Sequence, residues 1–173
     1  MKIVNIVCSG DCNCKINFNM LSDLDDSIFS YDPEIYHGCY IKLKVGKATL
    51  YTSGKYILVG LKQYEDIDSA FFQLRTILSN FFNVSSMQCP TIQNIVAIET
   101  FNFKINLNEF CVFFKDQDID YETEQFPGLI LKIKKKITIL VFSSGKVIFT
   151  GMKNKEEVSE TYDFFKRCIT KLR

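Results

Sequence analysis

Two stretches of this sequence, FSSGKVIFTG at residues 142–151 and YTSGKYILVG at residues 51–60, are versions of one ten-residue motif. Five of the ten positions are identical, and the two copies stand 91 residues apart. Self-similarity at a long, fixed period is the sequence signature of a duplicated structural unit. The motif therefore predicts a fold made from two copies of one supersecondary unit.

Further matches extend this repeat along the chain. NIV at residues 5–7 matches NIV at 94–96, and YDPEIYHG at 31–38 matches YETEQFPG at 121–128. The offset drifts from 89 to 91 residues, as small loop insertions would produce. We therefore expect two repeats, one at residues 1–86 and one at residues 87–173.

The apolar pattern predicts the elements of each repeat. Apolar residues recur at steps of four and three from Ile67 to Phe81 and again from Val158 to Leu172, which predicts a helix of about five turns closing each repeat. Residues 129–135, 136–142 and 146–151 read as strands, with a hairpin turn at 143–145. We expect an α+β fold with one antiparallel sheet of about ten strands and four helices on one of its faces.

The strand at residues 137–142 is apolar on both of its faces. Ile139 and Val141 point to one side of the sheet, and Leu140 and Phe142 point to the other. The expected helices can cover only one of these sides. The other face is therefore expected either to be buried in a dimer or to bind something large and apolar.

Composition narrows the class of protein. The chain has 173 residues, 47% of them hydrophobic, and a net charge of +1, which is not the strong basicity of a typical nucleic-acid binder. It has no run of 18 apolar residues, and its first residues predict a strand rather than a signal peptide. Seven cysteines without such a signal indicate a reducing, intracellular location.

The sequence offers little for catalysis or metal binding. Cys8, Cys12 and Cys14 have no second cysteine pair at zinc spacing, and His37 is the only histidine in the chain. A phosphate-binding glycine loop is absent as well. We expect no enzyme, no catalytic residue, no metal site and no cofactor.

The ordered motifs resemble the TATA-binding protein core from Ile3 to about Leu172, most strongly in YETEQFPGLILKIKKKITILVFSSGKVIFTG at residues 121–151. The resemblance implies a pseudo-twofold saddle whose concave sheet face enters the DNA minor groove. TATA-binding proteins are themselves an established example of β-sheet proteins that kink DNA there. It also implies a general initiation factor that binds and bends A/T-rich promoter DNA. Such a factor recruits a transcription factor B-type protein and RNA polymerase.

The resemblance assigns roles to particular residues. Tyr36, Tyr51, Phe126 and Phe142 match four phenylalanines that wedge between base steps. Asn5 and Asn94 match a central pair that donates to adenine N3 or thymine O2. The remaining implied DNA contacts are Val7, Lys42, Ser53, Lys55, Ile57, Val59, Val96, Lys132, Leu140, Ser144, Lys146, Ile148 and Thr150. Glu122, Glu124, Pro127 and Gly128 match the loop that docks the factor B-type protein.

The first repeat departs from the family pattern. It has tyrosines at both wedge positions, Val59 where the second repeat has Thr150, and Thr49 where the second has Leu140. We therefore expect the second repeat to kink DNA more reliably than the first, and a strict TATA preference is in doubt on the first repeat's side.

Two other functions stay open, together with the compartment. One is a divergent paralogue that acts mainly as a protein-interaction scaffold with weak or altered DNA specificity. The other is the nucleic-acid clamp module that some repair or RNA-processing enzymes share with this fold, against which the absence of a catalytic domain argues. The expected location is the nucleus for a eukaryotic chain, the cytoplasm or nucleoid for an archaeal one, and the viral factory or virion for a viral one.

Overall fold

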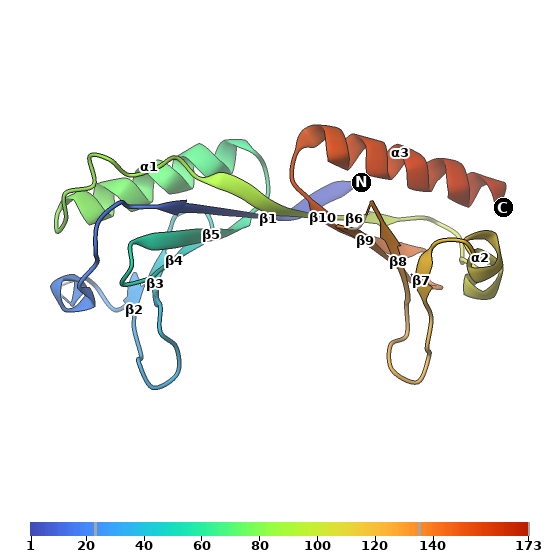
Figure 1. The fold of residues 1–173 in the computed structure, drawn as a ribbon, viewed down its shortest axis with the longest axis horizontal. Helices are drawn as coiled ribbons and strands as arrows, with labels where there is room; N and C mark the ends of the chain where they lie inside the picture. Colours follow the sequence, from blue (N-terminus) through green and yellow to red (C-terminus); the bar gives the residue numbers. More distant parts are fainter. Residues whose placement is uncertain (23, 135, 173) are drawn as a thin grey trace. The chain divides into compact units, whose positions relative to one another are not determined.

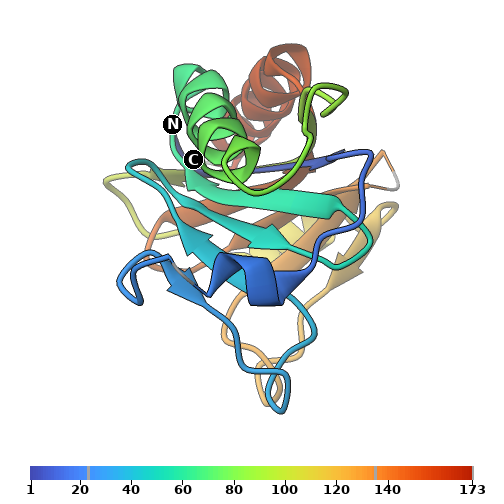
Figure 2. The same ribbon diagram turned by 90° about the vertical axis from the view of Figure 1, so that its left-hand side faces the viewer.

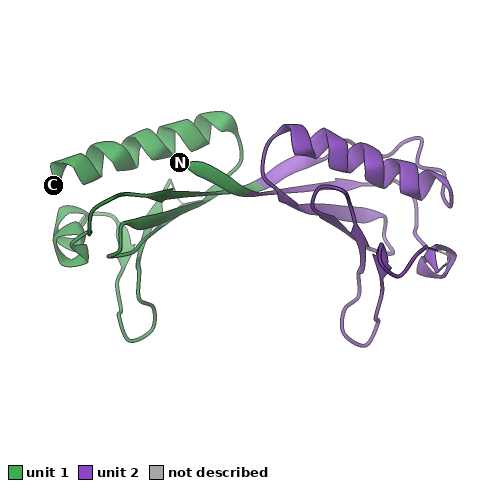
Figure 3. Cartoon of the chain, turned by 180° about the vertical axis from the view of Figure 1, so that it is seen from behind, with its two compact units in different colours: residues 1–4, 94–173 green, residues 5–93 purple. Residues whose placement is uncertain are grey.

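The chain forms two compact units in a computed structural model that describes residues 1–22, 24–134 and 136–172. One unit, here called unit 1, comprises residues 1–4 and 94–173, and unit 2 comprises residues 5–93 (Figure 3). Each unit therefore holds most of one sequence repeat. The boundary between the repeats at residues 86 and 87 stays a prediction.

Unit 2 contains five strands that pair antiparallel in the order β2-β3-β4-β5-β1. The first strand begins in unit 1 and continues into unit 2. The elements in chain order are β1 (Lys2–Asp11), the 3-10 helix η1 (Phe18–Leu21), β2 (Phe29–Ser30), β3 (Cys39–Lys42), β4 (Lys47–Leu50), β5 (Lys55–Leu61) and α1 (Glu65–Ser79).

Unit 1 repeats this plan with strand order β6-β10-β9-β8-β7. Its elements are β6 (Thr91–Thr100), α2 (Leu107–Phe113), β7 (Asp118–Asp120), β8 (Leu129–Ile133), β9 (Ile137–Val141), β10 (Lys146–Met152) and α3 (Lys155–Lys171). The predicted α+β class, the duplicated plan and the ten antiparallel strands are confirmed. None of the helices formed by the described residues is long and apolar enough to cross a bilayer.

The prediction of four helices needs a small correction, because the described residues form three α-helices and one 3-10 helix. The short helix of the first repeat is a single tight turn in which Ser22 N–H bonds the Asn19 carbonyl. It is followed by the polar sequence SDLDDS, which gives an amphipathic helix nothing to bury. Its counterpart α2 continues through FCVF and completes two turns.

The two long helices bury the middle of the predicted apolar stripes, whereas Phe81 and Leu172 lie just beyond the ends of α1 and α3. Phe71, Leu74 and Leu78 of α1 are buried, as are Phe165 and Ile169 of α3. Each helix lies along one face of its own unit's sheet, as Figures 1 and 2 show. The Asn154 side chain accepts a hydrogen bond from Glu157 N–H at 2.8 Å and thereby caps the N-terminus of α3.

The opposite side of each sheet is here called the open face. In unit 1, Ile139, Val141 and Phe149 are fully buried beneath α3, whereas Leu140 and Ile148 point the other way and are half-buried. These two residues are cross-strand partners. The predicted two-sided apolar strand is therefore confirmed, and within the described residues the helices cover only one of its sides. The loops between β2 and β3 and between β7 and β8 extend away from the helices in Figure 1.

Removing one aromatic ring from the core beneath α3 tests how much this core contributes to stability. Phe165 is fully buried, with its ring centroid 5.5 Å from that of Phe149 and 5.8 Å from that of Phe110. We expect Phe165→Ala to lower the free energy of unfolding by about 3–5 kcal/mol, since it removes a ring and leaves a cavity. Urea unfolding followed by circular dichroism measures this loss.

Phe72 provides the matched control because it is a helix phenylalanine that is 60% exposed. Its replacement by alanine should cost about 1 kcal/mol or less. Equal losses in the two variants would contradict the core assigned here.

Candidate nucleic-acid interface

The glycine that ends the repeat motif lies beside a β-bulge in each unit. The pairing of β1 with β5 shifts register between Ile6 and Cys8, and the pairing of β10 with β6 shifts between Phe149 and Met152. Gly60 and Gly151 have φ angles of 83° and 92°, which glycine adopts without strain. An alanine Cβ at Gly151 would lie 2.0 Å from the Lys136 carbonyl oxygen.

An asparagine side chain caps each of these bulges. Gly60 N–H donates to Asn5 Oδ1 at 2.8 Å, and Gly151 N–H donates to Asn94 Oδ1 at 2.7 Å. Because a backbone N–H can only donate, the atom that it contacts must be the amide oxygen. Each side-chain NH2 group is therefore fixed as the end that remains available for donation.

The half-buried residues of the open face include most of the predicted groove contacts. In unit 2 these are Asn5, Val7, Ile57 and Val59, and in unit 1 they are Asn94, Val96, Leu140, Ile148 and Thr150. The Thr150 hydroxyl lies 3.2 Å from Asn94 Nδ2. At the equivalent position Val59 has no hydroxyl, so only the second repeat has a polar side chain at this position.

The Ser-Gly-Lys turns place one ring of each predicted wedge pair. Tyr51 N–H donates to the Lys55 carbonyl and Phe142 N–H to the Lys146 carbonyl, both at 2.9 Å. The glycines of these turns have φ angles of 96° and 92°. Tyr51 and Phe142 therefore stand at the same place in their hairpins, because the turn sequence is shared.

The loops supply the other ring of each pair. Phe126 meets Phe142 edge to face, with ring centroids 5.7 Å apart and planes at 64°. Tyr36 meets Tyr51 in the same way, at 6.2 Å and 61°. Gly128 makes the phenylalanine pair possible, since an added Cβ would lie 2.8 Å from Phe126 and 2.9 Å from Phe142. The rings of Phe126 and Phe142 are half-buried and not enclosed in the core.

The tyrosine pair differs from the phenylalanine pair by a hydrogen bond between its hydroxyls. Tyr36 Oη and Tyr51 Oη lie 2.5 Å apart. This hydrogen bond, together with burial, raises the pKa of the Tyr51 phenol to about 12. Each phenol thus has a partner, which reduces the desolvation cost expected from the sequence for an isolated hydroxyl.

The predicted phosphate contacts are exposed, and their strand positions alternate onto the open face. Lys42, Lys55, Lys132 and Lys146 are all exposed. Lys132 also lies 3.7 Å from the Asp118 carboxylate, a surface pair that water screens strongly. Ser53 and Ser144 are exposed as well, and each hydroxyl accepts from the backbone N–H two residues further on, at 3.4 and 3.5 Å.

A hollow of about 720 Å³ in unit 2 adjoins several of these residues. Its lining includes Tyr51, Ser53, Lys55 and Ile57. These four come from the repeat motif that the sequence singled out. The hollow is therefore lined by an aromatic ring (Tyr51), a hydroxyl (Ser53), a cation (Lys55) and an apolar side chain (Ile57).

The predicted partner-binding residues occupy the loop between β7 and β8. Glu122, Glu124 and Pro127 are exposed, whereas Gly128 is buried beneath the two phenylalanine rings. The Glu122 carbonyl accepts from Gln125 N–H and Phe126 N–H at 3.0 Å, so the loop folds back on itself. Gly128 thus acts within the loop by making room for the rings.

Sequence reasoning missed several side chains of the open face. Cross-strand pairing puts Ile98 beside Ile148, and Tyr40 beside Thr49. The residues that were missed include Tyr40, Lys47, Ile98, Ile130 and Thr138. Strand alternation from Lys132 and Leu140 could have identified Ile130 and Thr138, since every second residue of a strand shares a face.

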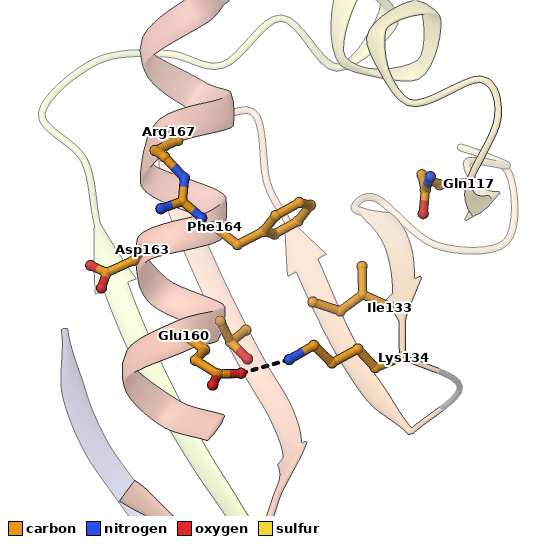
Figure 4. Close-up of a pocket in the computed structure, with 8 residues that line it drawn as sticks. Gln117, Ile133, Lys134, Glu160, Asp163, Phe164 and Arg167 are labelled. Carbon is orange, nitrogen blue, oxygen red and sulfur yellow. Dashed lines mark hydrogen bonds and ion pairs between the residues drawn. The ribbon is translucent and has the colours of Figure 1, made fainter. Parts of the chain in front are cut away.

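A pocket on the helix side of unit 1 is separate from the open face (Figure 4). It measures about 480 Å³ and lies beside α3, with Ile133, Phe164 and Arg167 in its lining. Lys134 Nζ and Glu160 pair across it at 2.6 Å. The charges of Lys134 and Glu160 are therefore already paired with each other.

The cysteines near β1 have low reactivity. Burial raises the pKa of the Cys8 thiol to about 11 and that of Cys12 to about 12. Both thiols therefore stay protonated at neutral pH, which makes them poor nucleophiles. Among the residues that the structure describes, no three histidine, cysteine or acidic side chains gather as metal ligands.

Known proteins share this sequence and fold along almost the whole chain. The family model described as "Transcription factor TFIID (or TATA-binding protein, TBP)" matches residues 1–81 and 89–172. TATA-box-binding protein C of Halobacterium salinarum is 30% identical over 178 residues, covering 99% of this chain and 98% of that protein. The TATA-box-binding protein of Methanothrix thermoacetophila is 38% identical over 135 residues, covering 75% and 74%.

A solved structure agrees with these matches. The TBP of Methanococcus jannaschii superposes with a TM-score of 0.78 at 27% sequence identity, covering 98% of both chains. The fold and the repeats define a duplicated α+β transcription factor. This chain belongs to the TATA-binding protein family, which confirms the resemblance and the prediction that it is not an enzyme.

The tyrosine pair gives a prediction that needs no ligand. Tyr36→Phe removes the hydroxyl that bonds Tyr51, so the pKa of Tyr51 should fall from about 12 toward the ordinary value near 10. The Cζ chemical shift of labelled tyrosine, followed against pH, measures it. Tyr31→Phe, at an exposed tyrosine outside the pair, should leave the midpoint of Tyr51 unchanged. An unchanged midpoint in Tyr36→Phe would show that the hydroxyls do not bond in solution.

Proposed function

We propose that the chain is a general transcription initiation factor that binds the minor groove of A/T-rich, TATA-like promoter DNA with its two open faces and bends it. The NH2 groups of Asn5 and Asn94 carry this proposal, because the oxygen of each amide is already bound to a glycine N–H and the NH2 end is left to donate. A·T pairs offer only acceptors in the minor groove, adenine N3 and thymine O2. Two donors on otherwise apolar faces match that pattern.

The rest of each open face supports the same proposal. Val96, Leu140 and Ile148 supply an apolar surface that suits the sugars and base edges of a widened groove. Phe126 and Phe142 stand at the margin of that surface in the position of a wedge, and such wedges kink DNA by unstacking a base step. The lysines and serines of the turns would hold phosphates, which positions a protein without reading sequence.

The partners follow from the same role. Promoter DNA and the transcription machinery in general are the partners that the family implies. More narrowly, we propose that Glu122, Glu124 and Pro127 contact a transcription factor B-type protein and that RNA polymerase joins through it. Such a factor works inside the cell, in the compartment that holds the genome.

The alternative of a protein-interaction scaffold with weak DNA affinity is not favoured. A scaffold would have no reason to keep an amide donor aimed from both open faces, or a paired phenylalanine wedge. The full-length relatives are named TATA-box-binding proteins, and the chain covers almost all of the Halobacterium one.

DNA bending tests the proposal directly. A short duplex with one TATA-like segment carries a donor dye at one end and an acceptor at the other, so that bending raises energy transfer. We expect Phe142→Ala to abolish most of this rise and to weaken binding at least about tenfold, because one wedge is lost. Tyr51→Ala should lose less bending.

Phe72→Ala serves as the control, since Phe72 is an exposed ring on the helix α1. It should bind and bend like the unmodified protein. Absence of binding by the unmodified protein would overturn the proposed function, and equal losses at Phe142 and Tyr51 would contradict the asymmetry between the repeats.

An isosteric change can test the amide donor alone. Asn94→Asp keeps an oxygen for Gly151 N–H but replaces the NH2 donor by a carboxylate oxygen. That oxygen would be repelled by the acceptor atoms of an A·T pair, adenine N3 and thymine O2. We expect stability to change little and affinity for an A·T duplex to fall about a hundredfold or more, measured by fluorescence anisotropy.

Asn106→Asp makes the same charge change away from the open face. Asn106 caps α2, and aspartate is an equally good N-cap, while the lost amide donor to Glu109 affects only this helix end. Its affinity for the duplex should therefore stay within about threefold of the unmodified protein. A similar loss in both variants would mean that added charge, and not the lost donor, weakens binding.

A further inference from the structure

The strand pairing within each unit shows which open-face residue of one repeat corresponds to which residue of the other. Tyr40 and Thr49 are partners between β3 and β4, and Ile130 and Leu140 are the partners at the same place between β8 and β9. Lys47 pairs with Val59, just as Thr138 pairs with Thr150. Such equivalent positions carry different chemistry in the two repeats.

These differences gather around the wedge of the first repeat. The Tyr36 ring stacks on the Tyr40 ring, with centroids 5.5 Å apart and planes at 6°. Lys47 Nζ lies 4.4 Å from the centroid of the Tyr40 ring. The second repeat has Ile130 and Thr138 at the positions of Tyr40 and Lys47. The wedge in unit 2 is therefore part of a polar aromatic cluster, here defined as Tyr36, Tyr40, Lys47 and Tyr51.

Ring geometry alone does not separate the two wedges. Their interplanar angles, 61° for the tyrosines and 64° for the phenylalanines, are nearly equal. What differs is the pair of hydroxyls at 2.5 Å. One hydroxyl hydrogen is used between them, so the pair keeps one O–H donor and unused oxygen lone pairs.

The minor groove gives those lone pairs a specific target. A G·C pair differs from an A·T pair there by one donor, the guanine N2 amine. A phenylalanine edge cannot accept from this amine, and burying it unpaired is unfavourable. A phenol oxygen can accept from it.

We propose that the tyrosine pair makes the first repeat tolerant of a G·C pair at the base step its rings reach, whereas Phe126 and Phe142 keep the second repeat selective for A·T. This inference rests on the proposed function, since it concerns the same DNA contact. The protein then binds a site with one G·C end in a single orientation, with the first repeat over that end.

Four duplexes that differ only at the two outer steps of the site test this idea. The first has A·T at both ends, the second G·C at one end, and the third G·C at both. The fourth repeats the second with inosine in place of guanine, which removes only the N2 amine. Affinities come from anisotropy titrations at one fixed salt concentration.

The unmodified protein should bind the first, second and fourth duplexes within about threefold of one another, and the third at least about tenfold more weakly, the size of one base contact. The Tyr36→Phe/Tyr51→Phe protein should bind the second duplex at least about tenfold more weakly than the first, and inosine should restore the loss. The reciprocal Phe126→Tyr/Phe142→Tyr protein should bind the third duplex about as well as the first.

The outcomes separate the two levels of the proposal. If no protein binds the A·T duplex, the proposed function fails and this inference fails with it. If all three bind the A·T duplex but the tyrosine-to-phenylalanine change leaves the second duplex unaffected, only the inference is overturned. A penalty for one G·C end in the unmodified protein, of the same size as in the variant, overturns it as well.

Discussion

A hydrogen bond from a bulge glycine to an asparagine side chain sets the chemistry of both open faces. The bulge needs a residue at positive φ, and at Gly151 a side chain would run into the Lys136 carbonyl. The unpaired glycine N–H then needs an acceptor, which Asn94 Oδ1 supplies. With its oxygen bound in this way, the amide keeps its NH2 end as the donor, next to the Thr150 hydroxyl at 3.2 Å. A requirement of backbone geometry thus produces a fixed donor on an apolar surface.

Stability and function are divided between the two sides of each sheet. Alternation sends Ile139, Val141 and Phe149 beneath α3, where burial stabilises the fold. Leu140 and Ile148 point to the other side and remain half-buried. An apolar surface left partly exposed contributes little to folding, and such surfaces commonly mark binding sites. The open face can therefore vary between the repeats while the helix side keeps its packing.

The sequence alone was sufficient to predict the duplicated plan and the helices and strands that have a strong apolar periodicity. Strand alternation at 137–142 and the stripes of the long helices predicted the two sides correctly. The four predicted helices include a short one in the first repeat, but the sequence did not show that this helix is the single 3-10 turn η1, because so short a turn leaves no periodic signal. The same limit applies to the contact between Tyr36 and Tyr51, which depends on how a loop folds back over a hairpin. The sequence paired Asn5 with Asn94 but could not show that each bonds a glycine more than fifty residues away.

The effect of the low net charge on DNA binding depends on where the charged side chains lie in the fold. A charge of +1 over the whole chain argues against a typical DNA binder, yet affinity depends on the cations that reach phosphates. Lys42, Lys55, Lys132 and Lys146 all alternate onto the open faces. Asp118 is the cross-strand partner of Lys132 and offsets part of this positive charge. Because the proposed interface has few cations, counterion release would contribute modestly, and apolar contact with the groove would supply much of the binding.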